Sequence, residues 1–325
     1  MDTQSINTDS NILNLVVGAS IPAAPPGYKS GFIGIIGRPN VGKSTLMNRL
    51  VGQKIAITSP VAQTTRNRLR GILTTEAAQL IFVDTPGIHK PHHQLGKVLV
   101  QNAQIAIQSV DVVLFVVDGS VESGGGDRYI VDLLSRTEAT VILGLNKIDL
   151  RPESEAENSR IFNTYAELAA PYNWQIGQFS AVTGEGLEAM QASLTAHLEP
   201  GPYYYPPDLV TDQPERFIMG ELIREQILLL TREEVPHSVA VTIDKVDEGK
   251  EITSVLATIY VERDSQKGIL IGKGGSMLKA IGSAARQQIQ KLIAGKVYLE
   301  LFVKVQPKWR QSRLHLAELG YRIES

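Results

Sequence analysis

The sequence contains no cysteine. A chain without cysteine can form no disulfide, no thiolate metal site and no cysteine nucleophile. It also lacks an apolar run of the ~20 residues that a helix needs to cross a bilayer. The first basic residue is Lys29, so the start of the chain lacks the basic segment that opens a secretory signal. We therefore expect a cytoplasmic protein without disulfides.

Charge of either sign is nearly balanced over the whole chain, with a net charge of −2, but its distribution is uneven. Residues 263–313 hold 11 Lys and Arg side chains against 2 Asp and Glu. Such a local surplus favours a polyanionic partner, because phosphates neutralised by basic side chains release their counterions. A solvated basic face without a partner is the alternative.

A phosphate-binding motif directly follows the apolar run at residues 32–36. The motif is GxxxxGK[ST], and a strand, a glycine-rich turn and a helix form the context that it requires. Gly37 and Gly42 allow backbone N–H groups to point inward, toward phosphate oxygens at the positive end of the next helix. Lys43 is expected to reach the β- and γ-phosphates, and the Ser44 hydroxyl to bind Mg²⁺. The alternative is a glycine turn with a chance Lys-Ser pair. The predicted contacts are Gly37, Arg38, Pro39, Asn40, Val41, Gly42, Lys43 and Ser44.

A second motif, Asn-Lys-Ile-Asp, follows the apolar run at residues 141–145 and is expected to read the base. The carboxylate of Asp149 can accept hydrogen bonds from N1–H and the 2-amino group of guanine, whereas adenine presents an unpaired acceptor there. Sites of this kind discriminate by roughly 10⁴-fold, because the wrong ligand leaves polar groups unsatisfied. Asn146 would hold the loop or contact the base, and the stem of Lys147 would cover it. Alone, the motif also fits a polar turn; behind a phosphate loop it predicts guanine. The expected base contacts are Asn146, Lys147, Ile148 and Asp149, with the backbone of Ser180, Ala181 and Val182 after a later strand.

A third motif, Asp84-Thr85-Pro86-Gly87, lies between these two and follows the apolar run at residues 79–83. Asp84 would hold Mg²⁺ through water, and the Gly87 N–H would meet the γ-phosphate. The order of the motifs along the chain is typical of a guanine-nucleotide-binding domain without circular permutation. This predicts an α/β fold, a mostly parallel sheet with helices on both faces.

A proline-rich stretch marks a domain boundary, and 325 residues are enough for two domains. Residues 187–198 have helical spacing, whereas residues 199–208 are too rich in proline for a helix or a central strand. Tyrosines 203–205 would pack this linker against a domain surface, with a binding role as the alternative. We expect a flexible extension at 1–28, the nucleotide domain at 29–200, the linker at 201–214 and a second domain at 215–325.

The second domain contains a glycine turn between two apolar helical segments. Two alternating stretches, at 238–243 and 252–261, are predicted strands, and a third strand is expected at 296–305. The strand-strand-helix-turn-helix-strand order is typical of a smaller α+β domain of the type II KH kind, whose turn clamps the backbone of single-stranded nucleic acid. The alternatives are a second phosphate loop and a plain helix cap, and no GK[ST] follows with the spacing that a second nucleotide site would need. The expected RNA contacts are Ile271, Gly272, Lys273, Gly274, Gly275 and Lys279.

The motifs of both halves together resemble the Era family of bacterial ribosome-assembly GTPases, over about residues 29 to 325. The strings that carry the resemblance, besides those above, are 63–66, 88–91, 180–186, 235–239 and 307–310. The resemblance implies hydrolysis of GTP to GDP and phosphate with Mg²⁺ as cofactor. It implies binding to the 3′ end of small-subunit (16S) ribosomal RNA during maturation of the 30S subunit, by a monomer. It also implies peripheral association with the cytoplasmic face of the inner membrane.

Four residues are assigned to catalysis on this basis: Lys43, Thr65, Asn40 and Gly87. Of the two threonines before Arg66, we favour Thr65 as the Mg²⁺ ligand beside Ser44 and Asp84. Ile88 stands where Ras-like proteins place a water-orienting glutamine, which predicts slow intrinsic turnover. Related GTPases with asparagine at the position of Asn40 recruit K⁺ beside the phosphates; alternatively, Asn40 only braces the loop. The histidines at 89, 92 and 93 lack the spacing and acidic partner of a metal site.

Two other functions compete with a GTPase switch. One is an RNA-binding adaptor whose nucleotide site is only structural, and the complete magnesium set argues against it. The other is a membrane-surface GTPase, since the basic stretch would suit anionic lipid as well as RNA. The glycine turn at 272–275 favours RNA, because lipid needs charge but no such loop.

Overall fold

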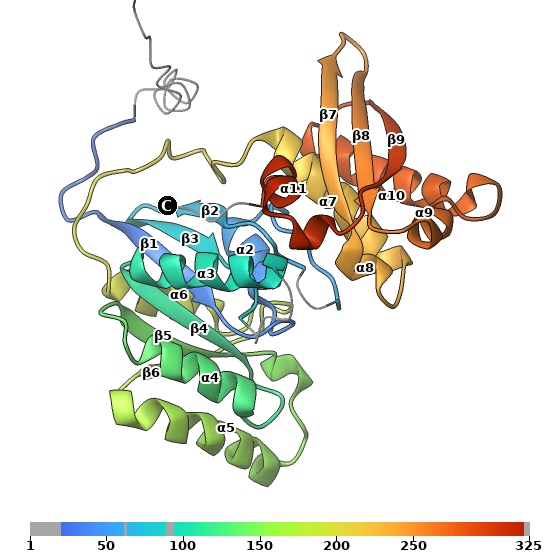
Figure 1. The fold of residues 1–325 in the computed structure, drawn as a ribbon. Helices are drawn as coiled ribbons and strands as arrows, with labels where there is room; N and C mark the ends of the chain where they lie inside the picture. Colours follow the sequence, from blue (N-terminus) through green and yellow to red (C-terminus); the bar gives the residue numbers. More distant parts are fainter. Residues whose placement is uncertain (1–20, 62–63, 89–93, 322–325) are drawn as a thin grey trace, which may run out of the picture.

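The computed structural model describes residues 21–61, 64–88 and 94–321, which form two sheets with their covering helices (Figure 1). The first sheet has the strand order β2-β3-β1-β4-β5-β6, and only the β2–β3 pair is antiparallel. Its strands are β1 (Lys29–Ile36), β2 (Leu69–Thr74), β3 (Ala78–Asp84), β4 (Val112–Asp118), β5 (Thr140–Asn146) and β6 (Gln175–Gln178). The predicted mostly parallel α/β domain is confirmed.

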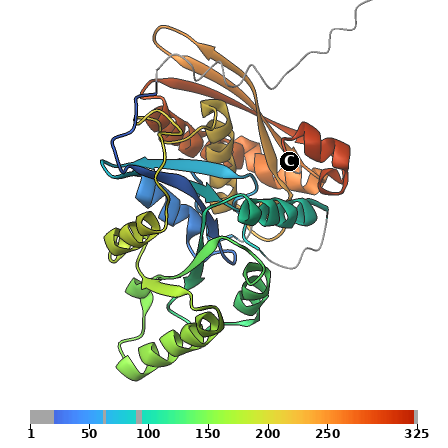
Figure 2. The same ribbon diagram turned by 90° about the vertical axis from the view of Figure 1, so that its left-hand side faces the viewer.

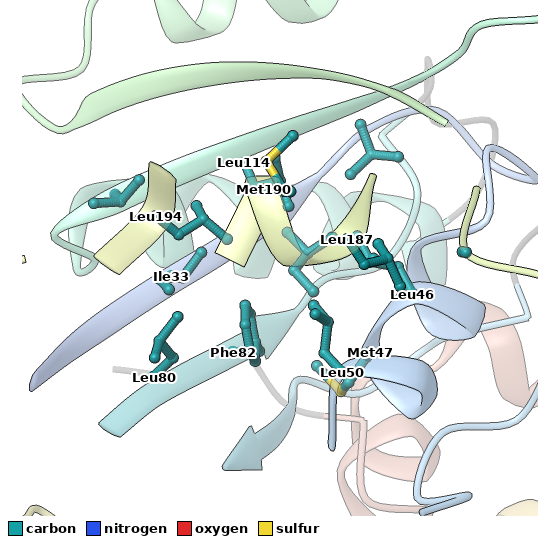
Figure 3. Close-up of a cluster of buried hydrophobic side chains, with 14 of the residues drawn as sticks. Ile33, Leu46, Met47, Leu50, Leu80, Phe82, Leu114, Leu187, Met190 and Leu194 are labelled. Atoms are coloured by element: carbon teal, nitrogen blue, oxygen red, sulfur yellow. The ribbon is translucent and has the colours of Figure 1, made fainter. Parts of the chain in front are cut away.

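Helices cover both faces of this sheet, because its central strands are apolar on both sides. Along β4, Val112 and Leu114 face one hydrophobic cluster, whereas Val113 and Phe115 face the other. On one face, α6 (Leu187–Ala196) and α2 (Lys43–Val51) pack against the strands, and Figure 3 shows side chains of both helices pointing at the sheet. The other face is covered by α3 (Gln94–Gln108), α4 (Gly125–Leu134) and α5 (Glu155–Ala169). The loops at the carboxyl ends of the parallel strands are therefore held on a rigid support.

The second sheet has the order β7-β8-β9, with the first pair antiparallel and the second parallel. The elements of this domain are α7 (Glu215–Leu230), α8 (Val235–Ser238), β7 (Ala240–Glu248), β8 (Thr253–Val261), α9 (Asp264–Ile271), the 3-10 turn η3 (Lys273–Gly275), α10 (Ser276–Leu292), β9 (Val297–Val305), the 3-10 turn η4 (Trp309–Gln311) and α11 (Arg313–Glu318). Side chains from α7, α9 and α10 share one hydrophobic cluster with the strands. This is the predicted strand-strand-helix-turn-helix-strand order, and the smaller α+β KH domain is confirmed.

Two local predictions were wrong. The first strand of this domain begins at Ala240 rather than at Ser238, because Pro236 opens the short helix α8 in the preceding segment. The same strand continues to Glu248, past a shift of register between Ile243 and Lys245 that breaks the apolar alternation. Such a bulge is set by pairing with β8, so the local pattern does not reveal it.

The linker lies against the nucleotide domain. The ring of Tyr203 is 4.5 Å from that of Tyr28, and the ring of Tyr204 is 5.3 Å from that of Phe32. The buried Gln79 accepts a hydrogen bond from the Tyr204 N–H and donates one to the Tyr205 carbonyl. The linker tyrosines therefore pack on the domain surface, as expected.

The two domains also meet through the end of the chain. Trp309, Leu316 and Tyr321 share a buried cluster with Leu95 and Leu99 of α3, and Figure 2 shows α11 beside that helix. Within the described residues, no helix is both long and apolar enough to cross a membrane.

Candidate nucleotide site and KH groove

The phosphate loop connects β1 to α2 at the carboxyl edge of the first sheet. A Cβ atom on Gly37 would lie 2.3 Å from the Val116 carbonyl oxygen, and one on Gly42 would lie 2.3 Å from Nδ2 of Asn146. Gly42 also has a φ of 96°, which side chains strongly disfavour. Both glycines are therefore required by the close approach of the loop backbone to residues of the neighbouring strands β4 and β5.

Lys43 is folded back over this loop. Its side chain is almost fully buried, and Nζ donates to the carbonyl oxygens of Gly37 (3.0 Å) and Arg38 (2.8 Å). Burial lowers the pKa of Lys43 to about 8, although the nearby Asp84 acts in the opposite direction. A phosphate bound in the loop would supply the negative charge that this buried ammonium favours.

Three side-chain oxygens converge beside the loop. Ser44 Oγ lies 2.9 Å from Thr65 Oγ1 and 2.9 Å from Asp84 Oδ2, and the Thr65–Asp84 distance is 3.2 Å. Burial raises the pKa of Asp84, while the charge of Lys43 lowers it, and among the described residues the Oδ1 atom of this carboxylate has no hydrogen-bond partner. A hard oxygen set with an unsatisfied buried carboxylate oxygen fits Mg²⁺. Thr64 instead donates to the Val61 carbonyl at 2.6 Å.

Asn40 links the phosphate loop to the loop between α2 and β2, which we call the α2–β2 loop. It adopts a φ of 65°, and its Nδ2 donates to the Pro60 carbonyl at 2.8 Å. The side chain therefore braces the loop in this conformation. This contact uses the amide nitrogen and not the carbonyl oxygen of Asn40.

Gly87 and Ile88 lie directly against the phosphate loop. A Cβ atom on Gly87 would lie 2.7 Å from the Pro39 nitrogen, so only glycine fits there. The Ile88 N–H donates to the Gly37 carbonyl at 3.2 Å, and its buried side chain joins the core under α3. An apolar side chain in the core cannot orient a water molecule. The histidines at 89, 92 and 93 lie outside the described residues; elsewhere in the described chain no group of three His, Cys, Asp or Glu is placed to hold a metal.

The side chain of Asn146 connects its own loop to two neighbouring loops by hydrogen bonds. Its buried Nδ2 donates to the Val41 carbonyl at 2.8 Å, and its Oδ1 accepts from the Ala181 N–H at 2.9 Å. These two bonds join the phosphate loop, the Asn-Lys-Ile-Asp loop and the Ser-Ala loop. Of the two roles open from the sequence, the geometry supports holding the loops together.

Asp118 is a site residue that the sequence reading missed. Lys147 adopts a φ of 66°, and its Nζ lies 2.6 Å from Asp118 Oδ2. Partial burial would raise the pKa of Asp118, but hydrogen bonds from Lys147 and Ser120 outweigh it and lower this pKa. The pair fixes the lysine stem where it would cover a base. The only signal was an aspartate at the end of an apolar run, next to the strand that carries the base motif.

The predicted base-reading residue Asp149 and the last predicted contacts, residues 180–182, differ in their exposure. Asp149 lies on a 3-10 turn, Ile148–Leu150, and is exposed. Ser180 and Ala181 are buried, whereas Val182 is 68% exposed. Asp149 is thus free to bind a ligand, while Asn146 and Lys147 hold the loop that presents it.

The glycine turn of the second domain lies between α9 and α10. Gly272, Gly274 and Gly275 have φ values of 71°, 59° and 81°, a conformation that favours glycine. A Cβ atom on Gly274 would meet nothing within 4 Å, so this side of the turn is open. Lys273 and Lys279 are both exposed beside it, and Ile271 ends α9.

A groove runs from this turn between α10 and β9. Of the predicted RNA contacts, Gly275 and Lys279 line it. The sequence reading missed the rest of its wall, which is Leu278, Gly282, Ser283 and Arg286 of α10 with Tyr298, Leu299, Glu300 and Leu301 of β9. The helical spacing of Lys279, Gly282 and Arg286 was the available signal, because such residues lie on one face.

A phosphate loop, an oxygen cluster suited to Mg²⁺ and a base-reading loop at one sheet edge, followed by a helix–glycine turn–helix domain, define a P-loop GTPase that carries a KH domain. A family model described as "50S ribosome-binding GTPase" matches residues 32–147, and a KH domain model matches residues 234–310. The chain is 74% identical to GTPase Era of Nostoc sp. (strain PCC 7120), covering 97% of both chains. It is 70% identical to GTPase Era of Rippkaea orientalis (strain PCC 8801), covering 96% of this chain and 99% of the relative. The chain belongs to the Era family, and it is a GTPase.

Two solved structures agree with this membership. An Aquifex aeolicus Era variant bound to GDP·AlF₄⁻ is 37% identical with a TM-score of 0.85, covering 90% of this chain and 99% of the other. An Era complex with MgGDPNP and nucleotides 1506–1542 of 16S ribosomal RNA is 36% identical with a TM-score of 0.85 and the same coverage.

Proposed function

We propose that this chain is a GTP-hydrolysing switch that binds the 3′ end of small-subunit ribosomal RNA and assists maturation of the 30S subunit as a cytoplasmic monomer. The observation that carries the proposal is the presence of both sites in one chain, with the nucleotide domain joined to the KH domain by buried clusters that include Ile57 of the α2–β2 loop and Leu95 of α3. The relative that was solved with both MgGDPNP and 16S ribosomal RNA supports it. Ser44, Thr65 and Asp84 would hold Mg²⁺ directly or through water, and this ion would neutralise charge on the β- and γ-phosphates.

The KH groove is the proposed RNA site. Lys273, Lys279 and Arg286 would meet the phosphates, and bases would lie across the apolar wall that ends at Tyr298. Anionic lipid at a membrane surface is the alternative partner for the same basic side chains. RNA is favoured because charge alone would suffice for lipid, whereas here a glycine turn is left open on the side where a nucleic-acid backbone would approach.

The experiment that tests this function measures GTP turnover with and without a single-stranded oligonucleotide of the 16S 3′ end. We expect stimulation by this oligonucleotide and none by a permuted sequence of the same length, because the groove must be filled before the domains respond. Liposomes of anionic lipid serve as the competing ligand. Stimulation by liposomes and not by RNA would contradict the RNA assignment.

K⁺ is the second proposed cofactor. The Asn40 carbonyl oxygen faces no partner among the described residues, so it can ligate a cation beside the phosphates while its nitrogen braces Pro60. We expect turnover in K⁺ buffer to exceed turnover in Na⁺ buffer by roughly 10²-fold, the lower end of what one electrostatic contact contributes in a transition state.

The substitution Asn40→Asp distinguishes K⁺ binding by the side-chain oxygen from the hydrogen bond to the Pro60 carbonyl. Aspartate keeps an oxygen ligand but cannot donate to the Pro60 carbonyl, whereas Asn40→Ala loses both. The K⁺ dependence should persist in Asn40→Asp and disappear in Asn40→Ala. Equal rates of the parent protein in the two buffers would rule out the cation.

A further inference from the structure

Arg66 crosses from the α2–β2 loop into the KH domain. Only 2% of this residue is exposed, and its guanidinium donates to a cage of backbone carbonyl oxygens. The acceptors are Pro236 and His237 in α8 and Val239 just beyond it. The guanidinium also lies 5.9 Å from the ring centre of Trp309 and 6.0 Å from that of Tyr321, within cation–π range.

The same loop is held from the KH side at two further points. The buried guanidinium of Arg224 in α7 donates to the Thr64 carbonyl and pairs with Glu221. The carboxylate of Glu225, one residue on, accepts from the Thr58 N–H at 2.8 Å and contacts Lys54 at 2.5 Å. A buried charged side chain is destabilising unless it is paired and hydrogen-bonded. The contacts of Arg224 and Glu225 therefore hold the α2–β2 loop in one position.

Thr65 lies between the two arginine contacts. The chain is fixed one residue before it, by Arg224 on the Thr64 carbonyl, and one residue after it, by the buried side chain of Arg66. Its hydroxyl is consequently held at hydrogen-bond distance from Ser44 and Asp84, the other members of the oxygen cluster. Among the described residues, the nucleotide domain supplies no comparable anchor at Arg66, because the carbonyl oxygens that accept from that guanidinium lie in the second domain.

We propose that Arg66 is a positioning residue of the GTPase site, through which the KH domain sets the place of the Mg²⁺-ligating hydroxyl of Thr65. This deepens the proposed function and rests on it. The KH domain is then a structural part of the GTP-competent site as well as an RNA-binding module. Loss of the anchor leaves Thr65 free to move, so it weakens interactions that involve the γ-phosphate and its Mg²⁺. Nucleotides without a γ-phosphate are bound by the phosphate and base loops and should be unaffected.

The test uses the full chain with Arg66→Met, which keeps an unbranched apolar stem and removes every donor. We expect kcat for GTP to fall roughly 10- to 100-fold, the scale for a displaced positioning group. Affinity for a non-hydrolysable GTP analogue should fall on the order of 10-fold, with GDP affinity unchanged. Raising the Mg²⁺ concentration should partly restore analogue binding, which loss of folding alone would not do.

Arg310→Met is the matched control. Arg310 donates to the same His237 carbonyl and pairs with Glu262, but it makes no hydrogen bond or ion pair with the described residues of the α2–β2 loop. We expect its nucleotide affinities and kcat to equal those of the parent chain. Arg66→Lys keeps the charge and at most part of the cage contacts, so it should fall between the parent and Arg66→Met.

Three outcomes decide the matter. Equal analogue affinity and kcat for Arg66→Met and Arg310→Met would overturn the inference. A parallel loss of GDP and analogue binding in both Arg66 variants would also overturn it, since that pattern indicates general damage. If the parent chain does not hydrolyse GTP, the proposed function fails, whereas the ratio of analogue to GDP affinity still decides the role of Arg66.

Discussion

Replacing Asp149 with asparagine should lower GTP affinity on the order of 10²- to 10³-fold, because one charge-assisted hydrogen bond to the base is lost and a donor faces a donor. An asparagine carbonyl can still accept from guanine N1–H, but its amide nitrogen then opposes the 2-amino group. Xanthine carries a carbonyl oxygen at that position and can accept from the amide. The variant should therefore bind xanthosine triphosphate better than GTP, which titration with both nucleotides will measure.

Asp208→Asn provides the control for charge. Asp208 is exposed in the linker, so this substitution removes the same charge at a position away from the predicted base site. Its affinities for the two nucleotides should match those of the parent chain. An equal loss of both nucleotides in Asp149→Asn would show damage to the loop and would contradict base reading by Asp149. The substitution Asp149→Asn should change base binding without disturbing the loop, because Asn146 and the Lys147–Asp118 pair hold the loop without help from the Asp149 carboxylate.

The fold was predictable because each nucleotide motif follows an apolar run. Parallel strands bring their carboxyl ends to one edge of a sheet, so motifs far apart in sequence must meet there. The same reasoning predicts that Ser44 and Asp84 are neighbours, and their side chains lie 2.9 Å apart. The glycine turn at 272–275 was equally predictable, because only glycine adopts the backbone conformations of this turn without strain.

The contacts between the domains could not be predicted in this way. Arg66 is separated by about 170 residues from its carbonyl acceptors, as the hydrogen bonds to Pro236 and His237 show. No local periodicity encodes such a pair, and an arginine in a polar loop is expected to face water. The sequence reading placed Arg66 only within a family string. It assigned no element to the last residues, although Trp309 and Leu316 are buried against α3.

The KH groove shows an intermediate case. A turn with a basic residue indicates where a nucleic-acid backbone would approach, but the opposite wall depends on which strand lies beside α10. Tyr298 is 55% exposed on β9, and its residue type and spacing are those of any edge strand. Its place in the groove follows from the packing of α10 beside β9, which the local sequence does not encode.

Replacing Gly274 with aspartate should lower affinity for a single-stranded 16S 3′-end oligonucleotide roughly 10- to 100-fold, because a negative charge would face the RNA phosphates. Gly274 has a φ of 59° and a ψ of 26°, and a Cβ atom there meets nothing within 4 Å. Aspartate and asparagine tolerate this backbone region better than most residues, so the turn should still form. GDP affinity reports whether the rest of the chain is intact, and fluorescence anisotropy at several salt concentrations measures RNA binding.

Gly274→Asn separates charge from shape at this position. Asparagine has nearly the same size as aspartate and the same tolerance of the backbone angles, but it carries no charge. If phosphate repulsion is the cause, the aspartate variant should bind RNA more weakly than the asparagine variant at low salt. The difference should shrink as salt rises, because exposed charges are screened beyond about 10 Å at 0.1 M. Equal losses at every salt concentration would assign the effect to bulk in the turn, and undiminished binding by both variants would move the RNA site away from the turn.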